Sequence, residues 1–272
     1  MVDKDSQDCN YKEEKGSQTC GLFDFMANDV GIKVLHPGGY KSTKELCSMC
    51  DLNESSYVLD LACGVGTTAF FISDRYGCRI AGIDISGDLI AIANKDLGKR
   101  GDEGNIRFEV ANALAIPFPD NTFDAVISQA FFILIDEKEE ALEEISRVLK
   151  PGGYFGSLEL SWFKAPPERV YEELVDKTCN DLIPRVVTFD EWDSFFLSKN
   201  LAHVATLEYP MDSGMLKMLE TEGVANFLRI MSKILGNSQT RTRMMTVQKT
   251  FRKHSDYLGY GLFCYRKQSK TG

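Results

Sequence analysis

Short apolar runs alternate with helical patterns along the chain from Tyr57 onward. The runs at 57–62, 78–85, 105–113, 123–133 and 153–161 have the length of buried strands, and helical stretches separate them. Strands and helices that alternate at this spacing predict a parallel sheet with helices on both faces. After Glu159 the alternation stops, and a helix-rich stretch to about His254 precedes one last predicted strand at 257–267.

The ends of two predicted helices carry recognisable signals. Ser86 is suited to be the N-cap of the stretch 87–99. The stretch that begins at Leu142 closes at Lys150, Pro151 and two glycines, which favour the end of a helix.

Residues 1–20 are polar and nearly free of large apolar groups, so we expect a flexible tail there. The hydrophobic content of 43% in 272 residues suits one domain over residues 21–272, with a helical cap inserted at about 211–254. No apolar run approaches the roughly 20 residues that span a bilayer, and the N-terminus has no apolar signal core. We therefore expect a cytoplasmic protein whose eight cysteines are mostly reduced.

The net charge of −9 argues against broad nucleic-acid binding, which needs clustered Lys and Arg. A local exception is formed by Arg241, Arg243, Lys249, Arg252 and Lys253. These residues would suit an anionic substrate or peripheral contact with a membrane surface, and a solvated helix face is the plainer interpretation.

The first strand leads into a glycine loop. Gly64, Gly66 and Ala69 fit a G-x-G-x-x-A spacing, and Asp84 ends the next strand, where a carboxylate can bind both hydroxyls of a ribose. Both features suit NAD as well as S-adenosylmethionine. Asp60, four residues before Gly64, would repel a pyrophosphate but attract a ligand that carries an ammonium and a sulfonium group. Asp60 therefore favours S-adenosylmethionine.

Four linked motifs resemble those of the class I S-adenosylmethionine-dependent methyltransferases, in the same order and spacing. They are VLDLACGVGT, GIDIS, NALAIPFPDNTFDAVIS and EEISRVLKPGG. The segment LHPGGYKSTKELCSMCDL resembles the helix and loop that precede the core in small-molecule members, which include enzymes that methylate quinones or arsenic species. The resemblance implies a Rossmann-like α/β sheet of seven strands, mostly parallel with an antiparallel last strand, and transfer of a methyl group to a small-molecule acceptor.

The resemblance also implies a set of cofactor contacts in this sequence. The methionine end would lie against the loop after the first strand, the ribose against Asp84 and the adenine beside Ile85. Asn112-Ala113 stands where the family usually has Asp-Ala, and an amide oxygen can still accept from the adenine amino group. Ala62 replaces a common glycine, and we expect an ordinary backbone conformation there. The implied cofactor residues are Asp60, Ala62, Cys63, Gly64, Gly66, Asp84, Ile85, Asn112, Ala113 and Gln129.

Methyl transfer is an in-line displacement that needs positioning and, for a protonated nucleophile, a base. Glu159 follows the predicted fifth strand, and His36 and Tyr40 flank Pro37-Gly38-Gly39 in a segment that could close over the cofactor as a lid. Each has a plainer interpretation, with Glu159 as a capping or solvated acid and His36 as a structural histidine. The catalytic group is therefore left open among these three.

Six of the nine methionines lie between Met211 and Met245. Such residues suit a pocket for an apolar or aromatic acceptor, and a helix core is the alternative. Cys47 and Cys50 form a C-x-x-C pair that lacks enough neighbouring ligands for a metal site, so we expect packed thiols and assign no metal.

Two other functions stay open. The chain could bind S-adenosylmethionine without transferring its methyl group, or it could methylate a protein or an RNA. The second is disfavoured because SQAFFI replaces an N-P-P-[YF]-type motif after the fourth strand, and no nucleic-acid-binding module is evident.

Overall fold

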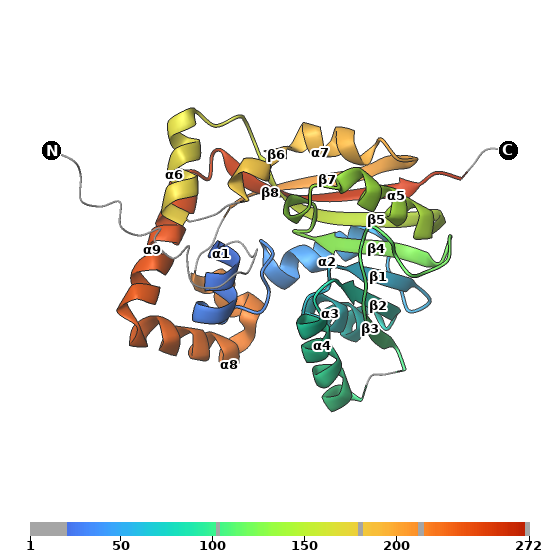
Figure 1. Ribbon diagram of the computed structural model, residues 1–272, viewed down its shortest axis with the longest axis horizontal. Coiled ribbons are helices and arrows are strands. Elements are labelled where there is room, and N and C mark those ends of the chain that lie inside the picture. The colour runs from blue at the N-terminus through green and yellow to red at the C-terminus, as the bar shows by residue number, and fades with distance from the viewer. Residues whose placement is uncertain (1–20, 102–103, 179–181, 212–214, 270–272) are drawn as a thin grey trace.

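A computed structural model describes residues 21–101, 104–178, 182–211 and 215–269 (Figure 1), so the predicted tail at 1–20 lies outside the described residues. Its strands are β1 (Tyr57–Leu61), β2 (Arg79–Asp84), β3 (Ile106–Val110), β4 (Phe123–Gln129), β5 (Leu149–Trp162), β6 (Val187–Thr188), β7 (Leu201–Pro210) and β8 (Leu258–Lys267). Its α-helices are α1 (Gly21–Asp24), α2 (Gly39–Met49), α3 (Thr67–Tyr76), α4 (Gly87–Arg100), α5 (Lys138–Val148), α6 (Glu168–Thr178), α7 (Phe189–Phe196), α8 (Met215–Gly236) and α9 (Ser238–Lys253). Three short helices of other types are η1 (Phe25–Val30), η2 (Phe132–Leu134) and η3 (Ile183–Arg185).

The strands join in one sheet in the order β3-β2-β1-β4-β5-β8-β7, with β6 paired to the end of β5. β1 is parallel to β2 and β4, and β4 is parallel to β5. β8 is antiparallel to both of its neighbours, β5 and β7. The predicted fold class, a mostly parallel Rossmann-like sheet with an antiparallel last strand, is confirmed. The short β6 adds an eighth strand to the expected seven.

β7 lies inside the stretch that the sequence pattern marks as rich in helix. Its residues are mostly exposed or half-buried, because β7 is an edge strand with β8 as its one neighbour in the sheet. An edge strand lacks the continuous apolar run of a central strand. The stretch after Glu159 is therefore not all helix, and β7 is the sixth strand that the expected seven-stranded sheet requires before the insert at 211–254.

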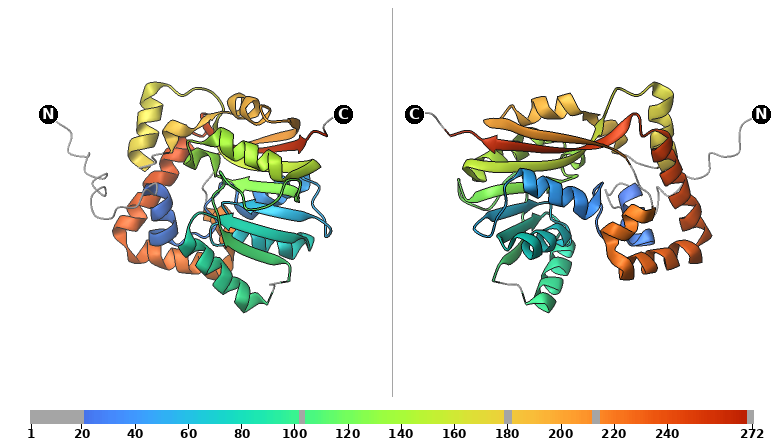
Figure 2. Two further views of the ribbon diagram at one scale, coloured as in Figure 1. Left: turned by 45° about the vertical axis from the view of Figure 1, so that its right-hand side comes forward. Right: turned by 180° about the vertical axis from the view of Figure 1, so that it is seen from behind.

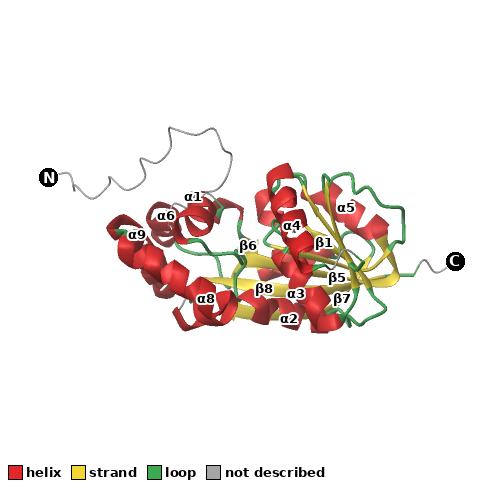
Figure 3. Ribbon diagram, turned by 90° about the horizontal axis from the view of Figure 1, so that it is seen from below, coloured by secondary structure: helices red, strands yellow, loops and turns green. Residues whose placement is uncertain are grey.

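The central strands form the core between two layers of helices. Val58, Ile127 and Phe155 of β1, β4 and β5 are fully buried. Figure 3 shows α2 and α3 on one side of the sheet and α5 on the other. On α7, the Trp192 ring stacks on Phe196 at 5.6 Å, and its indole N–H donates to the Leu160 carbonyl at 2.9 Å.

Three connections place the later helices at one end of the sheet. β5 ends at Trp162 before α6, β7 ends at Pro210 before α8, and β8 begins at Leu258 after α9. Because β7 runs parallel to β5 and β8 runs antiparallel, all three points lie at the carboxyl end of the parallel strands. α9 packs against both α6 and α8, and these helices form a cap beside the sheet (Figures 1 and 2). In open α/β sheets this end is where ligands bind.

Candidate cofactor and methyl-transfer site

The loop between β1 and α3 turns through three residues with left-handed backbone. The φ angles are 57° at Ala62, 54° at Gly64 and 80° at Gly66. The ordinary conformation expected at Ala62 is therefore wrong, and a residue with a Cβ pays roughly 1–2 kcal/mol in this region. The Cys63 amide donates to the Ile83 carbonyl at 3.0 Å, which ties the strained loop to β2.

The two glycines of the loop are needed for different reasons. A Cβ on Gly66 would lie 2.5 Å from the Phe108 ring, so this position is closed by packing within the fold. A Cβ on Gly64 would meet no atom within 4 Å. Open space therefore lies beside the Gly64 backbone, where a ligand can approach closely.

Asp84 organises the loop at the end of β2. Its Oδ2 accepts from the Gly64 amide and its Oδ1 from the Ser86 amide, both at 2.9 Å. The Ser86 hydroxyl accepts from the Leu89 amide at 3.3 Å, which confirms the predicted N-cap of α4. Each Asp84 oxygen keeps a second lone pair, so the carboxylate can still accept from two ribose hydroxyls.

Asp60 is a buried carboxyl with one oxygen left without a partner. Its side chain lies in β1 with the residue only 3% exposed, and the Ala69 amide donates to the carboxyl group. Within the described part of the chain, its Oδ2 makes no hydrogen bond. Burial, with a smaller contribution from the Asp84 charge, raises the pKa of Asp60 to about 8. A cationic group bound nearby would supply the missing partner and favour the ionised form.

Two aliphatic side chains next to Asp84 are unusually exposed. Ile85 is 74% exposed, and Val110, which lies opposite Asp84 in the β2–β3 register, is 58% exposed. Exposed apolar groups of this size are suited to pack against a flat, largely apolar ring.

Asn112 and Ala113 begin the next loop. The Asn112 side-chain oxygen accepts from the Leu114 amide at 2.9 Å, and its backbone carbonyl accepts from the Ala115 amide at 3.0 Å. Asn112 therefore forms a turn in this structure. The second lone pair of its side-chain oxygen stays available, so the predicted adenine contact remains a prediction.

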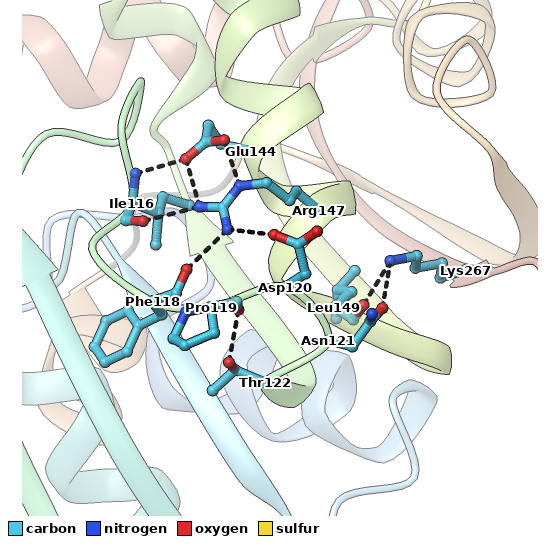
Figure 4. A network of polar contacts seen from close by, with 10 residues as sticks. All are labelled: Ile116, Phe118, Pro119, Asp120, Asn121, Thr122, Glu144, Arg147, Leu149 and Lys267. Carbon is cyan, nitrogen blue, oxygen red and sulfur yellow. Dashed lines mark hydrogen bonds and ion pairs between the residues drawn. The ribbon is translucent and has the colours of Figure 1, made fainter.

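An ion pair on α5 fixes the rest of this loop (Figure 4). The Arg147 guanidinium donates to the Ile116 and Phe118 carbonyls at 2.9 and 2.8 Å and pairs with Glu144 at 2.6 Å and with Asp120 at 2.9 Å. The Glu144 carboxylate in turn accepts from the Ile116 amide at 2.7 Å. Through these contacts the planar guanidinium holds two backbone carbonyls of the loop that carries Asn112.

Gln129, at the end of β4, is the centre of a chain of hydrogen bonds. The Thr68 hydroxyl, in the first turn of α3, donates to its Oε1 at 2.9 Å, and its Nε2 donates to Thr43 Oγ1 at 3.1 Å. Thr43 Oγ1 lies 3.4 Å from His36 Nε2, while His36 Nδ1 lies 3.3 Å from the Pro37 carbonyl. The segment at His36 is thus linked through Gln129 to the helix that follows the glycine loop.

His36 is a weak base in this structure. Desolvation of the imidazole lowers its pKa to about 4, so the ring is neutral near neutral pH. Tyr40 stacks on Phe71 at 4.7 Å, and burial raises the pKa of its phenol. Within the described residues, no hydrogen bond joins His36, Tyr40 and Glu159 to one another.

Glu159 lies inside β5, three residues before the strand ends at Trp162. The expectation that it follows the strand is wrong. Its Oε1 accepts from the Phe131 and Phe132 amides at 3.1 and 3.0 Å, which caps the start of η2. Burial raises its pKa to about 7, and no described residue forms a hydrogen bond with its Oε2. The geometry gives Glu159 a capping role, and its role as a base stays a prediction.

The cysteines of the C-x-x-C pair are buried. The Cys50 sulfur lies 3.8 Å from that of Cys264, and this contact, together with burial, raises the pKa of Cys50. Burial raises the pKa of Cys47. Among the described residues, no group of three His, Cys, Asp or Glu could hold a metal ion.

Several residues that shape the site carry no clear signal in the sequence. Thr43 and Arg147 act through partners far along the chain, so no local pattern identifies them. Thr68 and Val110 could be found from position alone. Thr68 lies in the first turn of the helix after the glycine loop, and Val110 ends the strand beside Asp84.

Comparison with known proteins matches the same region. Residues 58–153 match a family described as a methyltransferase domain. The chain is 28% identical over 241 residues to an uncharacterised protein of Haemophilus influenzae, covering 88% of this chain and 95% of that protein. It is 30% identical over 197 residues to the ubiquinone/menaquinone biosynthesis C-methyltransferase UbiE of Escherichia fergusonii, covering 68% of this chain and 77% of that enzyme.

A solved structure shares the fold. Phosphoethanolamine N-methyltransferase 2 of Haemonchus contortus, in complex with S-adenosylmethionine, superposes with a TM-score of 0.68 at 17% identity over 93% of this chain. The chain spans 61% of that protein and 23% of the phosphoethanolamine N-methyltransferase of Triticum aestivum. The strand order, the glycine loop and the match to UbiE agree, and the chain belongs to the class I S-adenosylmethionine-dependent methyltransferases.

Proposed function

We propose that this chain transfers the methyl group of S-adenosylmethionine to a small-molecule acceptor. The observation that carries the proposal is a convergence at the carboxyl ends of β1 and β2. There the open backbone at Gly64 lies next to the Asp84 carboxylate, and the unpartnered oxygen of Asp60 is buried on the adjacent strand. These groups match the backbone contact, the ribose and the cationic methionine end of one ligand.

The residues proposed to hold the cofactor are those named from the sequence, with Val110 added. Asp84 would accept from the ribose, while Ile85 and Val110 would enclose the adenine. The Ala113 amide would donate to the adenine ring, and Gln129 would face the methionine moiety. The full proposed set is Asp60, Ala62, Cys63, Gly64, Gly66, Asp84, Ile85, Val110, Asn112, Ala113 and Gln129.

When bound, S-adenosylmethionine supplies a methyl group that its sulfonium already activates, so the protein has to position the reactants and exclude water. The hydrogen bonds with Thr68 and Thr43 fix the side chain of Gln129 at the end of β4. Helices α6, α8 and α9 at the carboxyl end of the sheet would cover the acceptor. Phe227 and Met231 of α8 are half-buried, and the side chains of Met215 and Met218 lie outside the description.

Arg185 adds a polar group on the acceptor side. It ends η3, directly before the strand β6 that pairs with the end of β5. Its Nη2 pairs with Asp136 at 2.9 Å, whereas its buried Nη1 has no hydrogen-bond partner among the residues that the structure describes. We propose that this nitrogen donates to an oxygen of the acceptor, which would combine an apolar or aromatic body with a polar group.

Labelled turnover tests the proposed function. The purified protein is incubated with methyl-labelled S-adenosylmethionine and fractionated small-molecule extract, and products are identified by mass spectrometry. We expect a fraction that yields a methylated product together with S-adenosylhomocysteine, and loss of both with the Asp84→Ala variant. Cofactor binding without any methylated product would indicate a binding protein without transferase activity.

Binding is tested separately by isothermal titration. S-adenosylmethionine and S-adenosylhomocysteine should bind with about −5 to −8 kcal/mol, and NAD should not compete. Competition by NAD would contradict the cofactor assignment.

A further inference from the structure

The outer face of α8 carries an apolar stripe that nothing in the described part of the chain covers. After a kink at Gly223, where φ is 71°, the helix continues to Gly236. Val224, Leu228 and Leu235 are 67%, 61% and 63% exposed. Their spacing of four and seven residues places them on one face of the helix.

The stripe is not the core-facing side of an ordinary amphipathic helix. Ile230 and Ile234 already provide the buried face, with 0% and 9% exposure. On α9, Met245 is a further apolar side chain with 63% exposure. The Arg241 guanidinium donates to the Leu235 carbonyl at 3.2 Å, which places the start of α9 directly beside the end of the stripe.

The same helices concentrate positive charge in an acidic protein. Residues 223–255 contain no Asp or Glu, although the whole chain has 40 acidic and 31 basic residues. The exposed residues Arg241, Lys249 and Arg252 recur with Met245 at spacings of three or four along one face of α9. The basic residues of this stretch are Arg229, Lys233, Arg241, Arg243, Lys249, Arg252 and Lys253.

Both helices lie at the edge of the molecule, beyond the carboxyl ends of the parallel strands (Figures 1 and 3). A bilayer can therefore reach these two helices without contacting the sheet. No helix in the described residues has the length and apolar character of a membrane span. Contact would be made at the surface of the lipid.

We propose that the outer face of α8 and α9 docks on an anionic lipid bilayer. Val224, Leu228, Leu235 and Met245 enter the headgroup region, while Arg241, Lys249 and Arg252 pair with anionic headgroups. A helix with an apolar stripe and flanking Lys and Arg lies in the plane of such an interface. A second copy of the chain suits this face less well, because two such surfaces would bring like charges together.

Vesicle co-sedimentation tests the proposal with the full chain. We expect binding to vesicles of phosphatidylcholine with phosphatidylglycerol, weak binding to phosphatidylcholine alone, and release by high salt. Each basic residue near an anionic leaflet strengthens binding about fivefold, so the triple variant Arg241→Gln, Lys249→Gln, Arg252→Gln should lose about a hundredfold. The variant Val224→Ser, Leu228→Ser, Leu235→Ser should also lose binding.

Matched controls are Ile92→Ser and Lys95→Gln on α4, which alter an exposed aliphatic and an exposed basic residue outside α8 and α9. Both should bind vesicles like the unchanged protein, and thermal melts should show that every variant is folded. The proposal is overturned by equal binding to neutral and anionic vesicles, or by binding that the α8 and α9 variants leave unchanged. It is also overturned if the protein binds no vesicle and the stripe variant abolishes a dimer in sedimentation equilibrium, or if it binds only a DNA duplex.

Discussion

Asp60→Asn should stabilise the cofactor-free protein while weakening its affinity for S-adenosylmethionine. Burial raises the pKa of this carboxyl from 3.8 to about 8. The unfolded chain therefore releases the Asp60 proton at a lower pH than the folded chain does. Asp60 therefore leaves the free energy of unfolding unchanged below its ordinary pKa and lowers it as pH rises from about 4 to about 8.

The size of the effect follows from the same shift. One pKa unit corresponds to about 1.4 kcal/mol, so near neutral pH the buried carboxyl destabilises the folded state by about 4 kcal/mol. The Asn amide keeps an acceptor for the Ala69 N–H, but its own N–H groups lack partners, which costs about 1–3 kcal/mol. A net stabilisation of about 1–3 kcal/mol near pH 7 remains. It should reach zero between about pH 4.5 and about pH 6, and near pH 4 the variant should be less stable than the unchanged protein by about 1–3 kcal/mol.

The effect on binding has the opposite sign. The Asn variant removes a charge-assisted contact to the cationic methionine end, which is worth about 1.5–3 kcal/mol, so affinity for S-adenosylmethionine should fall about tenfold or more. Adenosine has no ammonium or sulfonium group, and its affinity should change less than about twofold.

Urea unfolding of the ligand-free protein at several pH values, with isothermal titration of both ligands, measures these effects. Asp256→Asn, an exposed acid, is the matched control and should leave both unchanged. The reasoning would be refuted by a variant that is less stable at every pH and whose affinity for adenosine falls as much as its affinity for S-adenosylmethionine. Asp60 would then be a structural acid.

Three further predictions concern the same site. Asp84→Ala removes acceptors of the Gly64 and Ser86 amides as well as the ribose contact, so titration should show at least about tenfold weaker binding of both S-adenosylmethionine and adenosine, and melts a lower Tm. Unchanged adenosine affinity would count against the ribose assignment. Glu159→Gln should keep turnover within about threefold and flatten the loss of stability between about pH 4.5 and about pH 7, because the group no longer titrates; a hundredfold loss of kcat with unchanged cofactor affinity would instead make Glu159 a base. Gly66→Ala places a Cβ 2.5 Å from Phe108 at a φ of 80°, so unfolding should show a loss of about 2–4 kcal/mol, whereas a change under about 0.5 kcal/mol would contradict the packing argument.

The fold and much of the candidate site could be predicted from short segments. Buried parallel strands are continuous apolar runs, so β1 to β5 are visible in the sequence, and edge strand β7 is not. Gly64 and Asp84 could be identified because the glycine loop after β1 and the acid at the end of β2 stand 20 residues apart, which is a characteristic spacing. The N-cap at Ser86 was predictable for the same reason, since its hydrogen bond closes within three residues.

By itself the sequence determined the alternation of strands and helices, the glycine loop and the acid at the end of β2, because these depend on neighbours along the chain. Only the tertiary structure decided that Ala62 is left-handed, that Asp60 is buried without a partner for one oxygen, and that Glu159 caps η2. It also decided that Arg147 holds the loop that carries Asn112 and that one apolar face of α8 stays exposed. The pKa and role of each such side chain depend on desolvation and on partners that folding brings from distant segments, and no local pattern encodes either.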